Sequence, residues 1–327
     1  MLQTCLDQFS ALRSPGPYAG PWIHHRPGTR HDRHVVFGVM THGDEVGPLP
    51  AALRLMAALA DGSLRYGGAL TVLLGNPEAG LAGRRYLEAD LNRVFLDGPH
   101  SHERQRAREM MAPLDDCDLF IDLHQTIGPS LGAFWTLPWS VAAWQWIRIA
   151  GGGALWTTRA PGVTFASGTR CGDEYVRDRG RPGLTLEMGQ KGFTEEAERV
   201  SYGVMTRVLA AVDAVATGST LAALAALCPE PRFLLTAHKE PFGDPTRALR
   251  PGLRNFEPVR AGQRLEAPGS PTITAPLDGL LLFPKYPERD PDGAVVPPAP
   301  TDLFHLVEDA AAHPLDLFGD SSGGALA

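Results

Sequence analysis

Three residues that can bind a metal ion stand beside two apolar stretches of the sequence. His42 and Glu45 follow the apolar run at residues 34–40, and His124 ends a second run at residues 118–124. Two imidazoles and one carboxylate make the ligand set of many catalytic zinc sites, in which water takes the open position. The spacing of His42 and Glu45 alone is a weak signal, because an acidic first turn of a helix has the same pattern. Together with His124, these residues predict a metal site.

Two further carboxylates lie within the apolar stretches. Asp122 is two residues before His124, so on a strand both side chains share one face, where Asp122 can orient a metal-bound imidazole or be an ordinary strand-end carboxylate. Glu187 lies inside the apolar run at residues 184–188. Desolvation there raises the pKa of a carboxyl toward the range of a general base, unless a nearby arginine pairs with it.

An arginine-rich segment at residues 84–93 carries groups that bind anions. It contains Arg85, Asn92 and Arg93, and Arg177 adds a further positive charge later in the chain. A guanidinium group holds a carboxylate through two parallel hydrogen bonds, which an ammonium group cannot do. The segment is therefore either a pocket for an anionic group or a solvated basic loop.

The elements that position these residues follow from the apolar patterning. Residues 1–33 are rich in Pro, Gly, Arg and His, and we expect them to wrap the surface. Beyond them, short β-branched runs alternate with helical periodicity. We expect strands at residues 34–40, 69–74, 118–124, 132–137 and 184–188, and helices at 47–60, 102–111, 141–149 and 194–215. Such alternation indicates an α/β domain with a largely parallel sheet, whose strand carboxyl ends collect ligands.

The composition and the patterning of the sequence change after about residue 226. Pro, Gly and short β-prone runs replace the helical patterns, and we expect strands at residues 233–236, 271–274 and 279–283. We therefore predict three parts: a catalytic α/β domain over residues 1–225, a small β-rich domain over 226–313, and a disordered tail over 314–327.

The overall composition excludes several classes of protein. The 327 residues include 30 Lys and Arg against 37 Asp and Glu, a net charge of −7, which disfavours nucleic-acid binding. No uninterrupted apolar stretch is long enough for a transmembrane helix. The N-terminus lacks a signal-peptide pattern, and the four cysteines are too scattered for a disulfide or zinc-finger framework. We expect a cytoplasmic protein with reduced thiols.

Four segments, taken in order, resemble the succinylglutamate desuccinylase/aspartoacylase family, which is related to the zinc carboxypeptidases. Residues 41–45 resemble its first metal motif, with Asp44 where the family usually has Asn. The substrate loop, the third-ligand motif and the catalytic-glutamate motif resemble residues 75–95, 122–126 and 186–189. The resemblance implies a zinc carboxypeptidase-like fold: a mixed, largely parallel sheet flanked by helices, with a small β-rich C-terminal domain that partly covers the site.

The same resemblance implies a metal centre and a reaction. His42, Glu45 and His124 would bind one Zn²⁺ per chain. Glu187 would deprotonate the zinc-bound water and later protonate the leaving amine, while Arg85 would polarise the scissile carbonyl. The implied activity is hydrolysis of the amide bond of a small N-acyl amino acid, in amino-acid metabolism.

The resemblance also implies a substrate pocket. Asn92, Arg93 and Arg177 would hold substrate carboxylates, and Tyr286 would close the pocket. Asp173 stands near the position of a pocket tyrosine in aspartoacylases, and a carboxylate there would repel an acidic substrate or select one that carries an amine. The sequence therefore leaves open which acyl group and which amino acid are recognised.

Two alternative functions are compatible with the residues. One is a metallocarboxypeptidase that acts on peptides, which a covering C-terminal domain disfavours. The other is an inactive ligand-binding homologue, which the presence of every ligand and of the base disfavours. The expected partner is a small-molecule substrate, with no nucleic acid and no membrane, and a homo-oligomer is compatible with the sequence.

Overall fold

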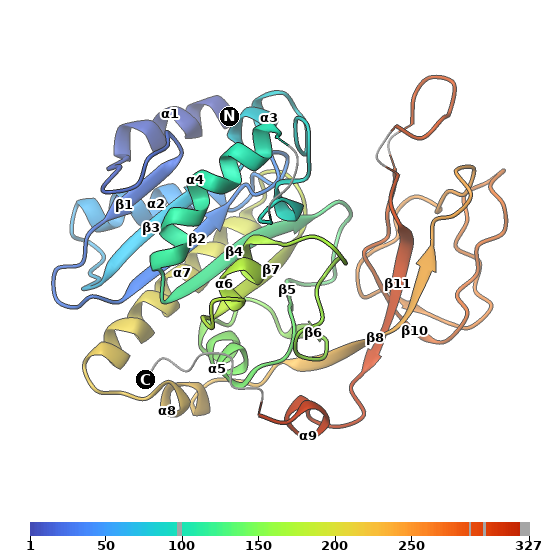
Figure 1. The fold of residues 1–327 in the computed structure, drawn as a ribbon. Coiled ribbons are helices and arrows are strands. Elements are labelled where there is room, and N and C mark those ends of the chain that lie inside the picture. The colour runs from blue at the N-terminus through green and yellow to red at the C-terminus, as the bar shows by residue number, and fades with distance from the viewer. Residues whose placement is uncertain (97–99, 288, 297–298, 321–327) are drawn as a thin grey trace.

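The computed structural model describes residues 1–96, 100–287, 289–296 and 299–320. These residues form a mixed sheet of 11 strands flanked by helices (Figure 1). The strand order is β1-β3-β2-β4-β7-β5-β6-β8-β11-β10-β9. The α/β class with a mixed, helix-flanked sheet is confirmed.

The strands cover most of the stretches that the apolar patterning indicates. Their bounds are β1 Ile23–Arg26, β2 His34–Val39, β3 Ala69–Leu74, β4 Leu119–Thr126, β5 Phe134–Thr136, β6 Leu155–Thr158, β7 Gly183–Gln190, β8 Arg232–Pro241, β9 Pro258–Val259, β10 Gly279–Leu282 and β11 Asp302–Asp309.

The helices lie in the connections between strands and at the two ends of the described chain. Their bounds are α1 Leu2–Leu12, α2 Leu49–Ala60, α3 Pro77–Leu81, a 3₁₀ turn η1 at Leu91–Arg93, α4 His102–Asp116, α5 Val141–Ala150, α6 Gly172–Arg177, α7 Glu195–Ala216, α8 Leu221–Ala226 and α9 Pro314–Phe318. Within the described residues, no helix combines the length and apolar character needed to span a bilayer.

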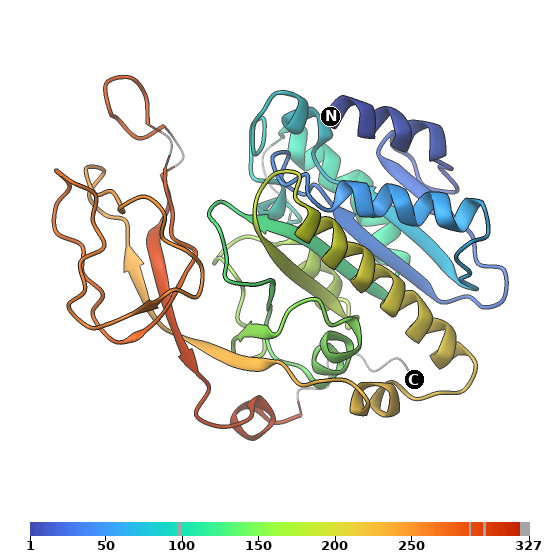
Figure 2. The same cartoon turned by 180° about the vertical axis from the view of Figure 1, so that it is seen from behind.

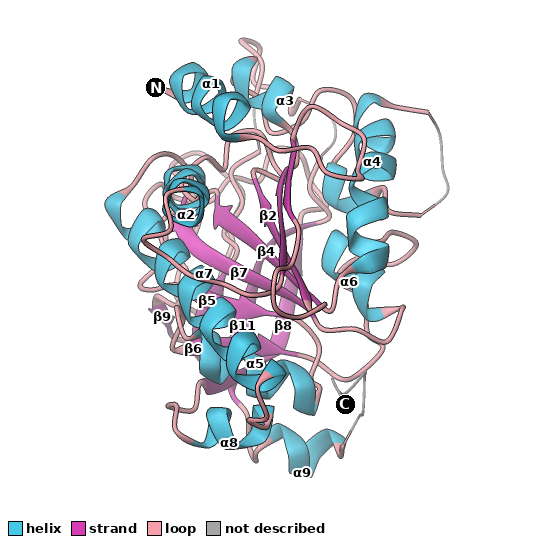
Figure 3. Cartoon of the chain, turned by 90° about the vertical axis from the view of Figure 1, so that its left-hand side faces the viewer, coloured by secondary structure: helices cyan, strands magenta, loops and turns pink. Residues whose placement is uncertain are grey.

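The helices cover both faces of the sheet, as expected where parallel strands are buried on both sides. Helices α2, α5 and α7 pack on one face, and α4 and α6 on the other (Figures 2 and 3). Helix α7 begins where the Thr194 hydroxyl accepts a hydrogen bond from the Ala197 amide at 3.1 Å. Its first turn carries three glutamates, which interact favourably with the positive end of the helix dipole.

Three parallel neighbouring strands, β2, β4 and β7, run through the centre of the sheet. Their register sets Val39 of β2 opposite Leu123 of β4, and His124 of β4 opposite Glu187 of β7. Because the carboxyl ends of parallel strands meet at one edge, the candidate residues at these ends are brought together.

The N-terminal segment differs from the expectation that residues 1–33 wrap the surface. Helix α1 buries Leu6 and Phe9 against the main apolar core, and β1 pairs antiparallel with β3. The polar composition of the segment hides this, since only one face of α1 and four residues of β1 carry the packing.

The C-terminal segment begins in the main sheet. Strand β8 pairs in parallel with β6 and antiparallel with β11 (Figure 1). The segment beyond β8 encloses a separate apolar cluster that includes Phe242, Leu265 and Phe304. The strand expected at residues 271–274 is wrong. Only Thr274 forms an isolated bridge there, because Pro271 donates no hydrogen bond and the segment follows a turn.

The disordered tail expected over residues 314–327 does not apply to its first residues, which form α9. The His313 imidazole accepts a hydrogen bond from the Leu315 amide, and the Trp139 indole donates to the Gly319 carbonyl at 3.0 Å. Residues 321–327 lie outside the described residues. The four cysteines are free thiols, as expected.

Candidate active site

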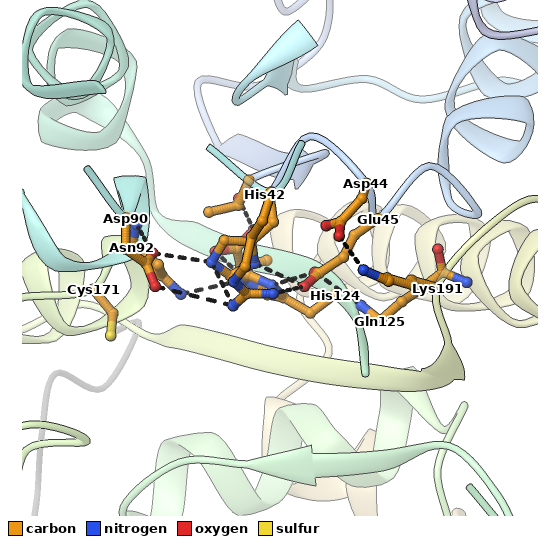
Figure 4. Close-up of polar contacts among 12 residues, drawn as sticks. His42, Asp44, Glu45, Asp90, Asn92, His124, Gln125, Cys171 and Lys191 are labelled. Carbon is orange, nitrogen blue, oxygen red and sulfur yellow. Dashed lines mark hydrogen bonds and ion pairs between the residues drawn. The ribbon is translucent and has the colours of Figure 1, made fainter. Parts of the chain in front are cut away.

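His42, Glu45 and His124 converge at the carboxyl ends of β2 and β4, with their side chains pointing toward one another (Figure 4). His42 Nδ1 lies 2.8 Å from one oxygen of Glu45, and His124 Nδ1 lies 2.8 Å from the other. All three side chains are buried, and their ligand atoms lie within 4.8 Å of one another. The structure thus brings together the three residues that the sequence predicts as metal ligands.

The turn after β2 owes its shape to two residues. Met40 has a φ of 56°, a left-handed conformation in which the extended strand β2 cannot continue. A Cβ on Gly43 would overlap the backbone of Ala79 and Gly80, so only glycine fits where the two loops touch. The Gly43 amide also donates to the Arg85 carbonyl at 2.8 Å, which ties the metal motif to the arginine-rich segment.

Each histidine contacts a carboxylate through its other ring nitrogen. His124 Nε2 lies 2.8 Å from Asp122, as the shared strand face predicts, and Asp122 also accepts a hydrogen bond from the Thr41 hydroxyl at 2.7 Å. His42 Nε2 lies 3.0 Å from Asp90. No local pattern marks Asp90 for this role, because the contact depends on how the loop before η1 folds back over β2.

The charges of the cluster stabilise one another. Burial alone would raise the pKa of Glu45, but His42 and His124 hold this pKa well below its usual range. Conversely, burial alone would lower the pKa of His124, but Asp122 and Glu45 raise it well above its usual range. The same carboxylates, Glu45 and Asp122, would also attract a metal cation.

These residues fit a zinc ion. His42 Nδ1 is buried and makes no hydrogen bond to any described residue, although it faces the Glu45 carboxylate at 2.8 Å. Both Nδ1 atoms face that carboxylate, while both Nε2 atoms face outer carboxylates, which is the arrangement that orients imidazole ligands. Two nitrogens and one carboxylate, without thiolate, form the donor set of hydrolytic zinc sites.

Glu187 lies directly across the strand pair from His124. Burial, helped by the nearby Glu45 charge and opposed by His124, raises the pKa of its carboxyl to about 7. Its Oε2 atom is buried without a hydrogen bond to the described residues. The carboxyl is therefore not held by a local arginine, and it has the properties of a general base.

Arg85 reaches the cluster from the arginine-rich segment. Its Nη1 donates to Glu45 at 2.7 Å, and its Nη2 lies 2.8 Å from His42 Nε2. The side chain is 33% exposed, so the protein does not wholly enclose the guanidinium group. Asp44 forms an ion pair with Lys191.

An inner cavity extends from this cluster and contains Asn92 and Arg93 in its wall. The Asn92 side chain accepts a hydrogen bond from the Gly172 amide at 3.0 Å, and the Arg93 guanidinium lies 4.9 Å from the centre of the Phe165 ring. The described residues that line the cavity are His42, Arg85, Asn92, Arg93, His124, Thr136, Arg159, Phe165, Cys171, Asp173, Thr185 and Glu187.

Arg177 is not among the described residues that line this cavity. It lies on α6, where its Nη1 donates to Asp173 and to the Gly183 carbonyl, both at 2.6 Å. Asp173 does line the cavity, but Arg177 neutralises its charge. Besides Arg85 and Arg93, the cavity is lined by Arg159, which follows β6 and was missed because no local pattern marks it.

Tyr286 does not reach either cavity beside Glu187. Its hydroxyl accepts a hydrogen bond from the Leu253 amide at 3.2 Å and donates to the Arg250 carbonyl at 3.1 Å, so it stabilises a loop of the C-terminal segment. That segment instead contributes other residues to an outer cavity bounded by Glu45 and Glu187: Lys239, Asn255, Phe283, Pro284, Lys285, Thr301, Asp302 and His305.

Comparison with known proteins decides the family. The model of the succinylglutamate desuccinylase/aspartoacylase catalytic domain matches residues 33–215, more than half of the chain. This chain belongs to the succinylglutamate desuccinylase/aspartoacylase family. The predicted resemblance is confirmed, and the matched residues include the whole His–Glu–His cluster and Glu187.

Individual relatives agree with this family. A succinylglutamate desuccinylase from Pseudomonas aeruginosa is 32% identical over 186 residues, which covers 51% of this chain and 54% of that protein. The chain therefore spans about half the length of the curated relatives that it matches. Among solved structures, the succinylglutamate desuccinylase from Chromobacterium violaceum has a TM-score of 0.65 at 18% identity and covers 95% of this chain and 98% of its own.

A mammalian structure shares the fold as well. Murine aminoacylase 3 has a TM-score of 0.59 at 20% identity, with 87% of this chain and 96% of that chain covered. At such identities the structural likeness describes the fold, and the activity of this chain has to be argued from its own residues.

Proposed function

We propose that this member of the family is a zinc-dependent hydrolase that cleaves the amide bond of a small N-acyl amino acid. One observation carries the proposal. The half-buried Glu187, with a buried, unpartnered carboxylate oxygen and a pKa of about 7, lies opposite His124 of the His–Glu–His cluster across a single strand pair. A metal site beside a general base is the arrangement that hydrolyses amides.

In this proposal His42, Glu45 and His124 hold one zinc ion per chain. When bound, such an ion supplies a Lewis acid and lowers the pKa of water to about 7. Asp90 and Asp122 keep the two imidazoles oriented toward the ion, because each contacts an Nε2 atom.

Glu187 moves the proton in the reaction. It removes a proton from the attacking water as the water oxygen bonds to the amide carbon, and it delivers that proton to the nitrogen as the carbon–nitrogen bond breaks. Arg85 donates a hydrogen bond to the carbonyl oxygen, where negative charge develops. The products are a carboxylate and a free amine.

The substrate occupies the inner and outer cavities on the two sides of Glu187. Asn92 and Arg93 hold a carboxylate of the substrate in the inner cavity, and Arg159 takes the place there that the sequence assigned to Arg177. Asp173 does not repel an acidic substrate, since Arg177 neutralises it.

We also propose that the fold is zinc carboxypeptidase-like, with a catalytic domain over residues 1–225 and a β-rich domain that begins at residue 226. The β-rich segment over residues 226–313 contributes one wall of the outer cavity. A wall over the site favours small N-acyl amino acids above the alternative of a carboxypeptidase acting on long peptides.

A deacylation screen tests the proposed function. Purified protein is incubated with N-acetyl, N-formyl and N-succinyl amino acids, and the released amine is measured with and without a chelator. We expect release from at least one N-acyl amino acid, abolished by the chelator and restored by zinc. Release that is insensitive to the chelator, or hydrolysis of peptides alone, would contradict the proposal.

A further inference from the structure

A buried carboxylate outside the metal cluster organises part of the arginine-rich segment at residues 84–93. Glu103 lies in the first turn of α4 and is fully buried. Its Oε1 accepts hydrogen bonds from the Asn76 side chain at 3.0 Å and from the Leu87 amide at 2.6 Å. Its Oε2 accepts hydrogen bonds from the amides of residues 88 and 89, at 3.1 and 3.0 Å. Four donors fill the acceptor capacity of one carboxylate.

The stretch at residues 86–89 depends on these contacts. It forms neither helix nor strand, and none of its backbone groups makes a hydrogen bond to another backbone group of the described residues. The tie to α4 is reciprocal, because the Glu88 carboxylate accepts a hydrogen bond from the His102 amide at 2.6 Å, at the start of the helix. Burial alone would raise the pKa of Glu103, but Asn76 and the three backbone amides lower it below its usual value. The carboxylate of Glu103 is therefore the group that fixes the path of this stretch.

The residues on either side of this stretch contact the metal cluster. Arg85 precedes it, and its guanidinium group lies 2.7 Å from Glu45 and 2.8 Å from His42 Nε2. Asp90 follows it and lies 3.0 Å from the same Nε2 atom. The path of residues 86–89 therefore sets where two charged groups meet the first imidazole.

The residues after Asp90 have anchors of their own. The Asp90 carboxylate accepts a hydrogen bond from the Asn92 amide at 2.9 Å, and the Asn92 side chain accepts one from the amide that begins α6, at 3.0 Å. On the other side, the Gly43 amide holds the Arg85 carbonyl, and Glu103 holds the backbone that follows. A change at Glu103 should therefore displace Arg85 and leave Asn92 in place.

We propose that Glu103 is a positioning residue that sets the guanidinium group of Arg85 beside the substrate carbonyl. The inference rests on the proposed function, in which Arg85 donates a hydrogen bond to the carbonyl oxygen. Such a donor has to be preorganised, because a misplacement of about 1 Å can cost roughly 10²-fold in rate. Glu103 is not among the described residues that line the inner or outer cavity, so it acts through the backbone of residues 86–89.

The substitution Glu103→Gln tests this role. It keeps the shape of the side chain but replaces one carboxylate oxygen with an N–H donor, so the amides that faced that oxygen lose their acceptor. We expect the variant to retain zinc, to keep KM within about twofold of the wild type and to lose at least tenfold in kcat. Steady-state kinetics and metal analysis on one preparation measure all three. An unchanged kcat, a loss confined to KM, or loss of zinc would overturn the proposal.

A double-mutant cycle tests whether the effect passes through Arg85. In an Arg85→Met background, Glu103→Gln should lower kcat by less than about threefold, because the group that it positions is absent. Asp213→Asn is the matched control, since the Asp213 carboxylate also holds a loop, through the Gly67 amide at 2.9 Å, but lines neither cavity of the candidate site. We expect this control to keep the kcat of the wild type. An equal loss from Glu103→Gln in both backgrounds would overturn the link to Arg85.

Hydrogen exchange of the full chain tests the contact without any assay of hydrolysis. We expect the amides of residues 87–89 to exchange at least tenfold faster in Glu103→Gln than in the wild type and in Asp213→Asn. Asn76→Ala, which removes one donor to the same carboxylate, should show a smaller increase and serves as the milder variant if Glu103→Gln does not fold. Unchanged exchange would overturn the proposal. Slow exchange in a wild type that hydrolyses no N-acyl amino acid would count against the proposed function instead.

Discussion

Two groups of buried histidines stand at opposite ends of β2, and their surroundings differ. His42 follows the carboxyl end of the strand and joins His124, whereas His34 is its first residue and packs beside His25. All four are less than 9% exposed. Burial alone therefore does not distinguish the two groups.

The contacts of the imidazoles make the difference. His42 and His124 face carboxylates on both ring nitrogens, and the pKa of each is raised despite burial. His25 Nδ1 and His34 Nε2 instead share the Thr71 hydroxyl, at 2.9 and 2.8 Å, and burial lowers the pKa of His34 to about 4. Neutral partners keep an imidazole uncharged, while converging carboxylates build a cation site.

Removing one imidazole from each group should have the largest effect, and it tests whether only the His42–His124 group binds zinc. His124→Ala should lose the zinc ion and all measurable hydrolysis, since two remaining ligands do not form a hydrolytic zinc site. His34→Ala should keep both. Elemental analysis of the two purified variants is the measurement, and full zinc occupancy in His124→Ala would remove this residue from the ligand set.

We expect the Glu187 carboxyl to contribute to catalysis without being needed to hold the metal ion. Glu187→Gln should retain the metal ion and lose about 10²–10⁴-fold in kcat, which is the usual contribution of a general base. Steady-state kinetics and metal content, measured on the same preparation, check this. Turnover near that of the wild type would rule out the assigned role.

Exchanging the partners of the histidines tests what the carboxylates do. Asp122→Asn should weaken zinc binding by about 10–100-fold, because the oriented imidazole loses its charged acceptor. Thr71→Val removes the hydroxyl between His25 and His34 and should leave zinc affinity unchanged. Competition with a chelator measures both affinities, and equal zinc affinities in the two variants would refute the distinction.

The smallest expected effect concerns stability at acid pH. The folded-state pKa of His34 lies below the usual value of about 6.5, so its unprotonated form stabilises the fold above that pH. This contribution is lost as the pH falls from about 6.5 toward 4. Urea unfolding of His34→Gln should show a pH dependence shallower by about 1 kcal/mol or more over that interval. An identical pH dependence of the wild type and of His34→Gln would contradict the lowered pKa of His34.

The sequence allowed the metal cluster and its base to be predicted for a simple physical reason. His42 follows β2, while His124 and Glu187 lie in the carboxyl-terminal halves of β4 and β7, and parallel neighbouring strands bring these ends together. The general position of these side chains thus follows from local patterning, once the strands are known to be neighbours.

Other residues of the site depend on tertiary contacts that no local pattern encodes. Arg159 reaches the inner cavity, and Arg177 turns away to pair with Asp173, because of how the chain between β6 and α6 folds. Tyr286 is held by backbone groups of its own segment. Among the elements of the fold, α1 was missed because it begins a segment rich in Pro, Gly, Arg and His, and only one of its faces is buried.

The metal content of the wild-type protein tests the central claim most directly. Protein purified without added chelator is analysed for metals, then dialysed against a chelator, assayed, and reconstituted with zinc. We expect one zinc ion per chain, loss of hydrolysis on its removal and recovery on its return. Hydrolysis that persists in protein free of zinc and of other divalent metals would contradict the account.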